Sequence, residues 1–375
     1  MTTPMWQITH DDVESIAIGA GILGTGGGGN PYLGRLLMQS LIEEGRTAYV
    51  INIDDIDDEA LVTEVGGMGA PTVGIEKLPN GEEPRWVIEA LERYIRRPID
   101  AIICAEIGGA NSIQPLIAAA LTGKPVLDGD GMGRAFPELQ MSTHFIDGAP
   151  CTPAALVDEK NNRIIFSSVT DPHALEKFAR DLCILMGCRA ELAVPVMTGA
   201  QVKRSAVRNT LSLSKQLGDA VRLARAKKAP VVDAILSVTG GAELFIGKLV
   251  DVHRQTTGGF ARGEILLEGL GYFRDRWLRI AFQNENLVAW ISDHRAIWKE
   301  VIACVPDLIC IIETESGEPV TTEQLRYGLR VTVLGIPCSD KLRTPKALEV
   351  VGPKAFGYPE VTYTPMSKVA GVGLK

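Results

Sequence analysis

A glycine run near the N-terminus limits the folds open to this chain more than any other segment does. Residues 24 to 29 read Gly-Thr-Gly-Gly-Gly-Gly, and Asn30 and Pro31 follow. Glycine loses more conformational freedom on folding than any other residue, so such a run is costly unless the backbone needs it. The usual need is an unusual turn, or a ligand, often anionic, that lies close against exposed N–H groups.

The flanks of this run indicate two helices joined by a loop. Thr9 and Asp12 form a capping-box pattern, and apolar residues follow at helical spacing as far as Leu23. The glycines also match the dinucleotide fingerprint Gly-x-Gly-x-x-Gly, but that fingerprint needs a preceding strand. We therefore expect a helix–loop–helix whose N–H groups bind a carboxylate, a phosphate or a developing oxyanion. A tight turn beneath another backbone segment is the alternative. The expected substrate-binding residues of this loop are Gly26, Gly27, Gly28, Gly29 and Asn30.

Strands and helices alternate over residues 1–170, which predicts an α/β domain with a largely parallel sheet. The expected strands cover residues 48–53, 61–65, 99–105 and 125–127. Residues 171–239 are interpreted as a helical connecting region. Short strands separated by glycine, proline or charged turns follow over 240–375, the last near 347–351. This pattern of short strands and turns predicts a β-rich domain, either a barrel or a sandwich.

Polar loops follow three of the expected strands, at the edge where open α/β sheets bind their ligands. Asp128 and Asp130 stand two residues apart, and such close carboxylates tend to raise one pKa, as acid–base catalysis requires. They also offer oxygen ligands for a divalent cation. Arg134 suits a substrate carboxylate. The alternative is a polar turn with a surface ion pair.

Two further candidates lie close to this acidic segment. Glu106 follows an apolar strand, with Asn111 in the same loop, and either faces the crevice or is an exposed loop carboxylate. His144 is a candidate proton shuttle, with a structural histidine as the alternative. The predicted catalytic residues are therefore Asp128, Asp130, Glu106 and His144, and the further substrate-binding residues are Asn111 and Arg134.

The composition indicates which kinds of partner the protein can bind and in which cellular compartment we expect it. The net charge is −8, which argues against nucleic-acid binding. The chain has no run of about 18 apolar residues, so we expect no membrane span. The first ten residues lack the basic-then-apolar order of a signal peptide. The seven cysteines contain no Cys-x-x-Cys pair and suggest reduced thiols. We therefore expect a cytoplasmic protein that binds a small molecule, and neither nucleic acid nor a membrane.

Several segments, in order along nearly the whole chain, resemble the S-methyl-thiohydantoin desulfurase-like family. That family occurs alone or joined to hydantoinase/oxoprolinase-type proteins. The matching stretches are 24–31, 106–111, 128–139, 256–260 (Thr-Thr-Gly-Gly-Phe), 305–308 (Val-Pro-Asp-Leu) and 351–357 (Val-Gly-Pro-Lys-Ala-Phe-Gly). The resemblance implies an N-terminal α/β domain and a C-terminal β-rich domain. It also implies attack on a sulfur-bearing carbon of a five-membered cyclic amide-like ring.

The resulting hypothesis is a hydrolase-like enzyme that acts on a hydantoin- or S-methyl-thiohydantoin-type ring. Water attacks the ring carbon, Asp128 or Asp130 is the general base, and Glu106 or His144 donates the proton. No cofactor is expected, although a divalent metal on Asp128 and Asp130 stays open as a third reading. The rival hypothesis is a non-catalytic partner or regulatory subunit of a hydantoinase-type enzyme. A homo-oligomer is also open.

Overall fold

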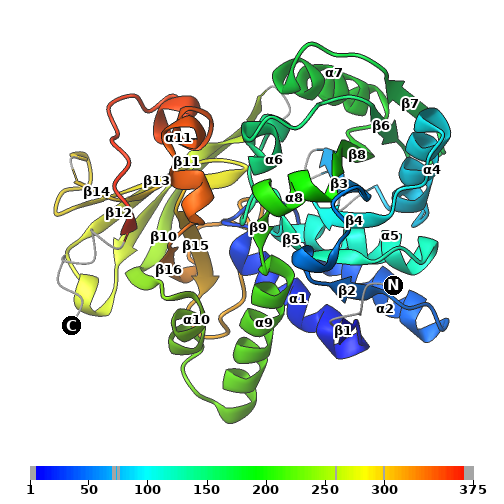
Figure 1. Ribbon diagram of the computed structural model, residues 1–375. Helices are drawn as coiled ribbons and strands as arrows, with labels where there is room; N and C mark the ends of the chain where they lie inside the picture. Colours follow the sequence, from blue (N-terminus) through cyan, green and yellow to red (C-terminus); the bar gives the residue numbers. More distant parts are fainter. Residues whose placement is uncertain (1–5, 70–72, 74–76, 258–259, 299, 367–375) are drawn as a thin grey trace.

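Two β-sheets stand side by side and organise the molecule, as Figure 1 shows. The computed structural model describes residues 6–69, 73, 77–257, 260–298 and 300–366. One sheet is mixed and carries most of the helices, and the other is antiparallel and strongly curled. The expected fold class, an α/β domain with a β-rich domain, is confirmed.

The first sheet has nine strands and a parallel centre. Its order is β1-β2-β5-β4-β3-β8-β6-β7, with β9 paired to β5. The neighbours β2, β5, β4 and β3 are parallel, and the remaining pairs are antiparallel. The strands are β1 (Trp6–Gln7), β2 (Tyr49–Ile51), β3 (Leu61–Gly69), β4 (Ala101–Cys104), β5 (Val126–Asp130), β6 (Ala154–Val157), β7 (Arg163–Phe166), β8 (Arg189–Thr198) and β9 (Val207–Arg208).

Helices cover both faces of this sheet, and β4 shows why. Successive side chains of a strand point to opposite faces. Ile102 packs in one core with α4 (Glu83–Ile95) and α5 (Gln114–Thr122), whereas Ile103 packs in another with α8 (Gly199–Ser205). A strand that is buried on both faces has a continuous apolar sequence, as Ala101–Cys104 does. The other helices are α1 (His10–Leu23), α2 (Tyr32–Glu43), α6 (Thr143–Ile146), α7 (Pro172–Leu185), α9 (Thr210–Lys227), α10 (Val231–Thr239) and α11 (Pro345–Val351).

The second sheet has seven antiparallel strands in the order β14-β13-β12-β11-β10-β16-β15. Its inner face forms a separate apolar core that includes Phe245, Phe282 and Ile309. The strands are β10 (Ala242–Thr257), β11 (Phe260–Gly269), β12 (Trp277–Gln283), β13 (Glu285–Ser292), β14 (Glu300–Cys304), β15 (Leu308–Glu313) and β16 (Arg330–Ile336). Two glycines of the matching stretch 256–260, at positions 258 and 259, lie outside the described residues.

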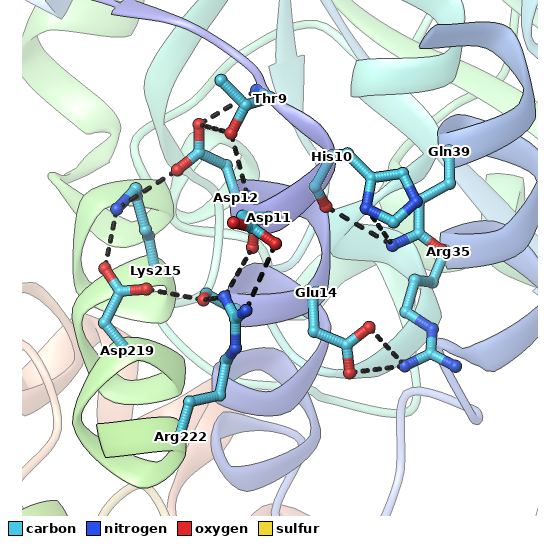
Figure 2. Close-up of polar contacts among 11 residues, drawn as sticks. Thr9, His10, Asp11, Asp12, Glu14, Arg35, Gln39, Lys215, Asp219 and Arg222 are labelled. Atoms are coloured by element: carbon cyan, nitrogen blue, oxygen red, sulfur yellow. Dashed lines mark hydrogen bonds and ion pairs between the residues drawn. The ribbon is translucent and has the colours of Figure 1, made fainter. Parts of the chain in front are cut away.

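The glycine run joins α1 to α2, so the helix–loop–helix interpretation is confirmed. Thr9 caps α1 through a capping box with Asp12, as the sequence predicts. Figure 2 shows how polar side chains tie α1 to its neighbours. Glu14 binds Arg35 of α2 at 2.6 Å, and Asp12 binds Lys215 of α9 at 3.2 Å. These ion pairs therefore tie the two helices that flank the loop to each other and tie α1 to α9.

The structure departs from the predicted elements where pairing is long-range. β3 continues through the glycines to Gly69 because Gly66 and Gly67 pair with β8, a strand that the sequence did not indicate. β5 continues to Asp130 because its end pairs with β9. The segment 171–239 thus contributes two strands to the first sheet in addition to its helices. The expected strand at 347–351 is instead α11, which Thr344 caps and Pro345 begins.

Candidate active site

A cavity of about 420 Å³ opens where the glycine loop meets the ends of β3 and β4. That size falls in the range of small-molecule sites. Residues from both sheets line it, since Glu64 comes from β3 of the first sheet and Glu285 from β13 of the second, with Asn284 in the turn before β13. Four of its lining glutamates are almost completely buried, with exposed fractions of 3% for Glu64, 7% for Glu106, 6% for Glu176 and 2% for Glu285, and Glu176 is paired with Arg180.

Glu106 lies just beyond β4 and is held by two donors. Its Oε1 accepts a hydrogen bond from Asn111 Nδ2 at 2.8 Å, and its Oε2 accepts one from the Phe136 N–H at 3.0 Å. Burial raises the pKa of Glu106 to about 7, although these two hydrogen bonds act to lower it. The carboxyl group therefore exchanges a proton near neutral pH, which suits general acid–base catalysis.

Glu64 lies in the middle of β3, and burial favours its protonated form. Its Oε1 accepts a hydrogen bond from Ser142 Oγ at 2.9 Å. Burial raises the pKa of Glu64 well above its usual value, and the negative charges of Asp130 and Glu106 raise it further. Sequence reasoning missed this residue because it lies inside an expected strand. The available signal was one carboxylate within the apolar run Leu61-Val-Thr-Glu-Val65.

Glu285 begins β13 and reaches the cavity from the other domain. Its Oε1 accepts a hydrogen bond from the Gly28 N–H at 3.1 Å. Its Oε2 is buried and has no hydrogen-bond partner among the described residues. Burial raises the pKa of Glu285 well above its usual value, and the nearby Glu106 raises it further. Sequence reasoning missed Glu285 because 257 residues separate it from Gly28.

Two sequence profiles match this chain from near one end to near the other. The S-Me-THD-like N-terminal domain matches residues 11–168, and the S-Me-THD-like C-terminal domain matches residues 170–366. The chain belongs to the S-Me-THD-like family. This confirms the resemblance that the sequence segments indicated.

A solved structure is also similar over nearly the whole chain. It is a crystal structure described as a protein from Chromobacterium violaceum, with 26% sequence identity and a TM-score of 0.78. The match covers 96% of this chain and 100% of that one. A search of curated proteins finds no match. The comparisons therefore supply the family and the fold, and the chemistry has to be argued from the site.

The predicted site residues of this S-Me-THD-like protein divide into two groups. Those that line the cavity are Gly28, Gly29, Asn30, Glu106 and Asn111. Those that lie outside its wall are Gly26, Gly27, Asp128, Asp130, Arg134 and His144. The first part of the glycine loop, at Gly26, is a tight turn packed against other backbone, because the Gly26 carbonyl accepts a hydrogen bond from the Thr322 N–H at 2.7 Å. The tight-turn alternative therefore holds for this part of the run, whereas Gly28, Gly29 and Asn30 line the cavity.

Asp128 and Asp130 are buried in β5 and are bound to groups of this chain. Ser212 donates to Asp128 through its N–H, at 3.0 Å, and through its hydroxyl. Asp130 Oδ2 accepts the N–H groups of Ile107, Met132 and Gly133 at 2.8, 3.1 and 2.7 Å. Burial raises the pKa of Asp130 to about 7. This arrangement holds the loops behind the cavity, and neither carboxyl group sits in the expected polar turn with a surface ion pair.

Arg134 is completely buried and does not reach the cavity. Its guanidinium donates to the carbonyls of Ala135, Asn286, Pro306 and Asp307 and to the Thr25 hydroxyl, at 2.8–3.3 Å. Three of these acceptors belong to the β-rich domain. The geometry therefore makes Arg134 a bridge between the two domains and gives it no contact with a substrate carboxylate.

His144 is completely buried behind Glu64. Its Nδ1 lies 2.6 Å from Ser205 Oγ, and its Nε2 lies 3.5 Å from Glu64 Oε1. Burial lowers the pKa of His144 to about 3, so the ring is neutral at physiological pH. His144 thus contacts a cavity residue without lining the cavity.

Two broader features bear on the expected partners. Among the residues that the structure describes, no group of three or more histidine, cysteine, aspartate or glutamate side chains is arranged to hold a metal ion. Within the same residues, no helix is both long and apolar enough to cross a membrane.

Proposed function

We propose that this protein is an enzyme that hydrolyses a hydantoin-type or S-methyl-thiohydantoin-type ring in the 420 Å³ cavity. The observation that carries the proposal is the pair of buried carboxyl groups, Glu106 and Glu64, on one cavity wall. Acid–base catalysis near pH 7 commonly uses two buried acids whose pKa values are raised by different amounts. Membership of the S-Me-THD-like family supports the same ring chemistry.

The protonation state of these acids also favours a cyclic amide. The edge of such a ring presents an N–H donor next to a C=O acceptor. A protonated carboxyl group presents the matching pair, an O–H donor next to a C=O acceptor. Burial raises the pKa values of Glu64 and Glu285 well above the usual range, which favours the protonated form of each group. Glu285 Oε1 already accepts the Gly28 N–H, so a proton on Oε2, which has no partner among the described residues, would be donated to a ring C=O.

The reaction assigns one role to each of two glutamates. Glu106, with a pKa of about 7, takes a proton from water as the water oxygen bonds to the ring carbon that carries sulfur. The C–S bond then breaks, and Glu64 donates its proton to the leaving thiolate. The ring nitrogen takes the C=N electron pair during the attack and returns it as the C–S bond breaks, and the remaining O–H proton then moves to this nitrogen. The products are methanethiol and the hydantoin ring. The proton on Glu106 returns to Glu64 through solvent, so both groups regain their starting states.

The decisive test is an assay of the isolated full chain on a panel of hydantoins and S-methyl-thiohydantoins, with thiol release and ring opening measured. We expect Glu106→Gln to lower kcat by 10²–10⁴-fold, the usual contribution of general acid–base catalysis. Glu191→Gln is the matched control, because Glu191 is buried, has a pKa raised to about 8 and lies outside this cavity wall. Wild-type turnover by Glu106→Gln would remove the proposed mechanism.

The same assay separates the rival hypotheses. Turnover that appears only after addition of a hydantoinase-type protein would favour a regulatory subunit. Turnover that a chelator abolishes and a divalent metal restores would favour the metal-dependent reading.

A further inference from the structure

We infer that His144 is a positioning residue that accepts a hydrogen bond from Glu64 and so keeps this cavity carboxyl a proton donor. The inference rests on the proposed function, because it explains how one of two neighbouring acids stays protonated while the other exchanges its proton. It is argued from a chain of contacts that runs from the cavity to α8. The chain is Glu64, His144, Ser205 and the carbonyl of Gln201.

The far end of the chain fixes the tautomer of the histidine. A serine hydroxyl has one proton to donate. Ser205 Oγ donates that proton to the Gln201 carbonyl at 2.7 Å. Toward His144 Nδ1, 2.6 Å away, Ser205 is therefore the acceptor. The neutral imidazole consequently carries its hydrogen on Nδ1, and Nε2 presents a lone pair.

The near end of the chain places that lone pair against the cavity acid. His144 Nε2 is buried, has no hydrogen-bond partner among the described residues and lies 3.5 Å from Glu64 Oε1. A lone pair repels an ionised carboxylate oxygen and attracts a carboxylic O–H. Catalytic hydrogen bonds are often long in the free enzyme and shorten when the substrate binds. The pair is therefore built for protonated Glu64.

The charges around the pair act in the same direction on Glu64. The negative charges of Asp130 and Glu106 both disfavour an ionised Glu64. Ser142 acts against them, because its hydroxyl donates to Glu64 Oε1 at 2.9 Å. On the imidazole, burial and the positive charge of Lys341 favour the neutral ring, and Asp147 acts in the opposite sense. A neutral histidine facing a protonated acid is the combination with least buried charge.

The test follows the protonation of Glu64 directly, by infrared spectroscopy of the carboxylic C=O band in the full chain without substrate. Loss of one band in Glu64→Gln assigns it. In Ser205→Ala the imidazole is released to carry its hydrogen on Nε2, where it donates to a carboxylate. We expect the midpoint for loss of the Glu64 band to move down by at least one pH unit, about a tenfold weaker hold on the proton. Ser205→Thr keeps the hydroxyl and restores the wild-type midpoint.

A second variant guards against misfolding of the first. His144→Asn removes Nε2 and is expected to lower the same midpoint. An unchanged midpoint in a folded variant, judged by circular dichroism, overturns the inference. The infrared result does not depend on turnover, so it distinguishes failure of the role of His144 from failure of the proposed function. A shifted midpoint without ring hydrolysis by the wild type sinks the proposed function alone, whereas an unshifted midpoint in an active enzyme sinks the role of His144 alone.

Discussion

The Gly28 N–H donates to Glu285 Oε1 across 3.1 Å and thereby joins the glycine loop to the β-rich domain. The sequence predicts that the N–H groups of this loop bind a ligand, and one of them is here taken by a carboxyl group of the same chain. The close approach also explains the glycines themselves. A Cβ on Gly27 would lie 2.0 Å from Glu285 Oε1, and a Cβ on Gly28 would lie 2.4 Å from the Gly108 carbonyl oxygen.

Neighbouring glycines of this loop should respond very differently to alanine. Gly28→Ala adds a clash with backbone to a left-handed φ of +71°, so we expect a loss of about 2–5 kcal/mol in unfolding free energy. Gly29→Ala shares the left-handed conformation, with φ at +76°, but its nearest neighbour is a methyl group 3.6 Å away. Its loss should be about 1–2 kcal/mol. Urea denaturation measures both, and equal losses would contradict the packing argument.

Arg134→Met should destabilise the whole protein. The substitution leaves buried carbonyls of two domains without a donor, at about 1–3 kcal/mol for each unsatisfied group. Arg222→Met is the matched control. Arg222 pairs with the exposed Asp11 (Figure 2), and such pairs contribute about 0–1 kcal/mol. A stable Arg134→Met with a raised KM would instead restore Arg134 as a substrate anchor.

Asp130 should prove more important for folding than for turnover. Asp130→Ala leaves the buried N–H groups of Ile107 and Met132 and the part-buried N–H of Gly133 without an acceptor, at about 1–3 kcal/mol for each unsatisfied buried group. Asp130→Asn keeps an oxygen for them, so it should fold and retain activity within tenfold of the wild type. Thermal unfolding and the ring-hydrolysis assay check the two variants. Loss of turnover in a fully folded Asp130→Asn would support the general-base role that the sequence predicts.

Stability should fall with rising pH because of Glu106. Its pKa rises from 4.5 to about 7 on folding, so the folded state binds one more proton than the unfolded state between these values. Unfolding free energy is therefore lost as the pH rises from about 4.5 to 7, by an amount on the order of 3 kcal/mol. Glu106→Gln should remove this part of the pH dependence. Urea denaturation of both proteins at pH 5 and pH 8 measures it, and parallel curves would contradict the shift.

The parts of this protein that the sequence predicted are those governed by local rules. The Thr9 cap, the end of α1 before the glycines and the apolar β4 each depend on neighbouring residues, and all three are found in the structure. Glu106 and Asn111 were also located, because a polar loop after a buried strand has little choice of position. The family was evident from ordered short segments, which need no knowledge of contacts.

Tertiary structure decided how the glycine loop and the carboxyl groups are used. Glu64 and Glu285 enter the cavity because β3 and β13 bring them there, whereas long-range pairing with β9 draws Asp128 and Asp130 into the sheet. Arg134 points inward, where its guanidinium donates hydrogen bonds to carbonyls of the second domain. A sequence states which side chains are chargeable, but burial and the partner across the fold set their pKa values and decide which of them a substrate meets.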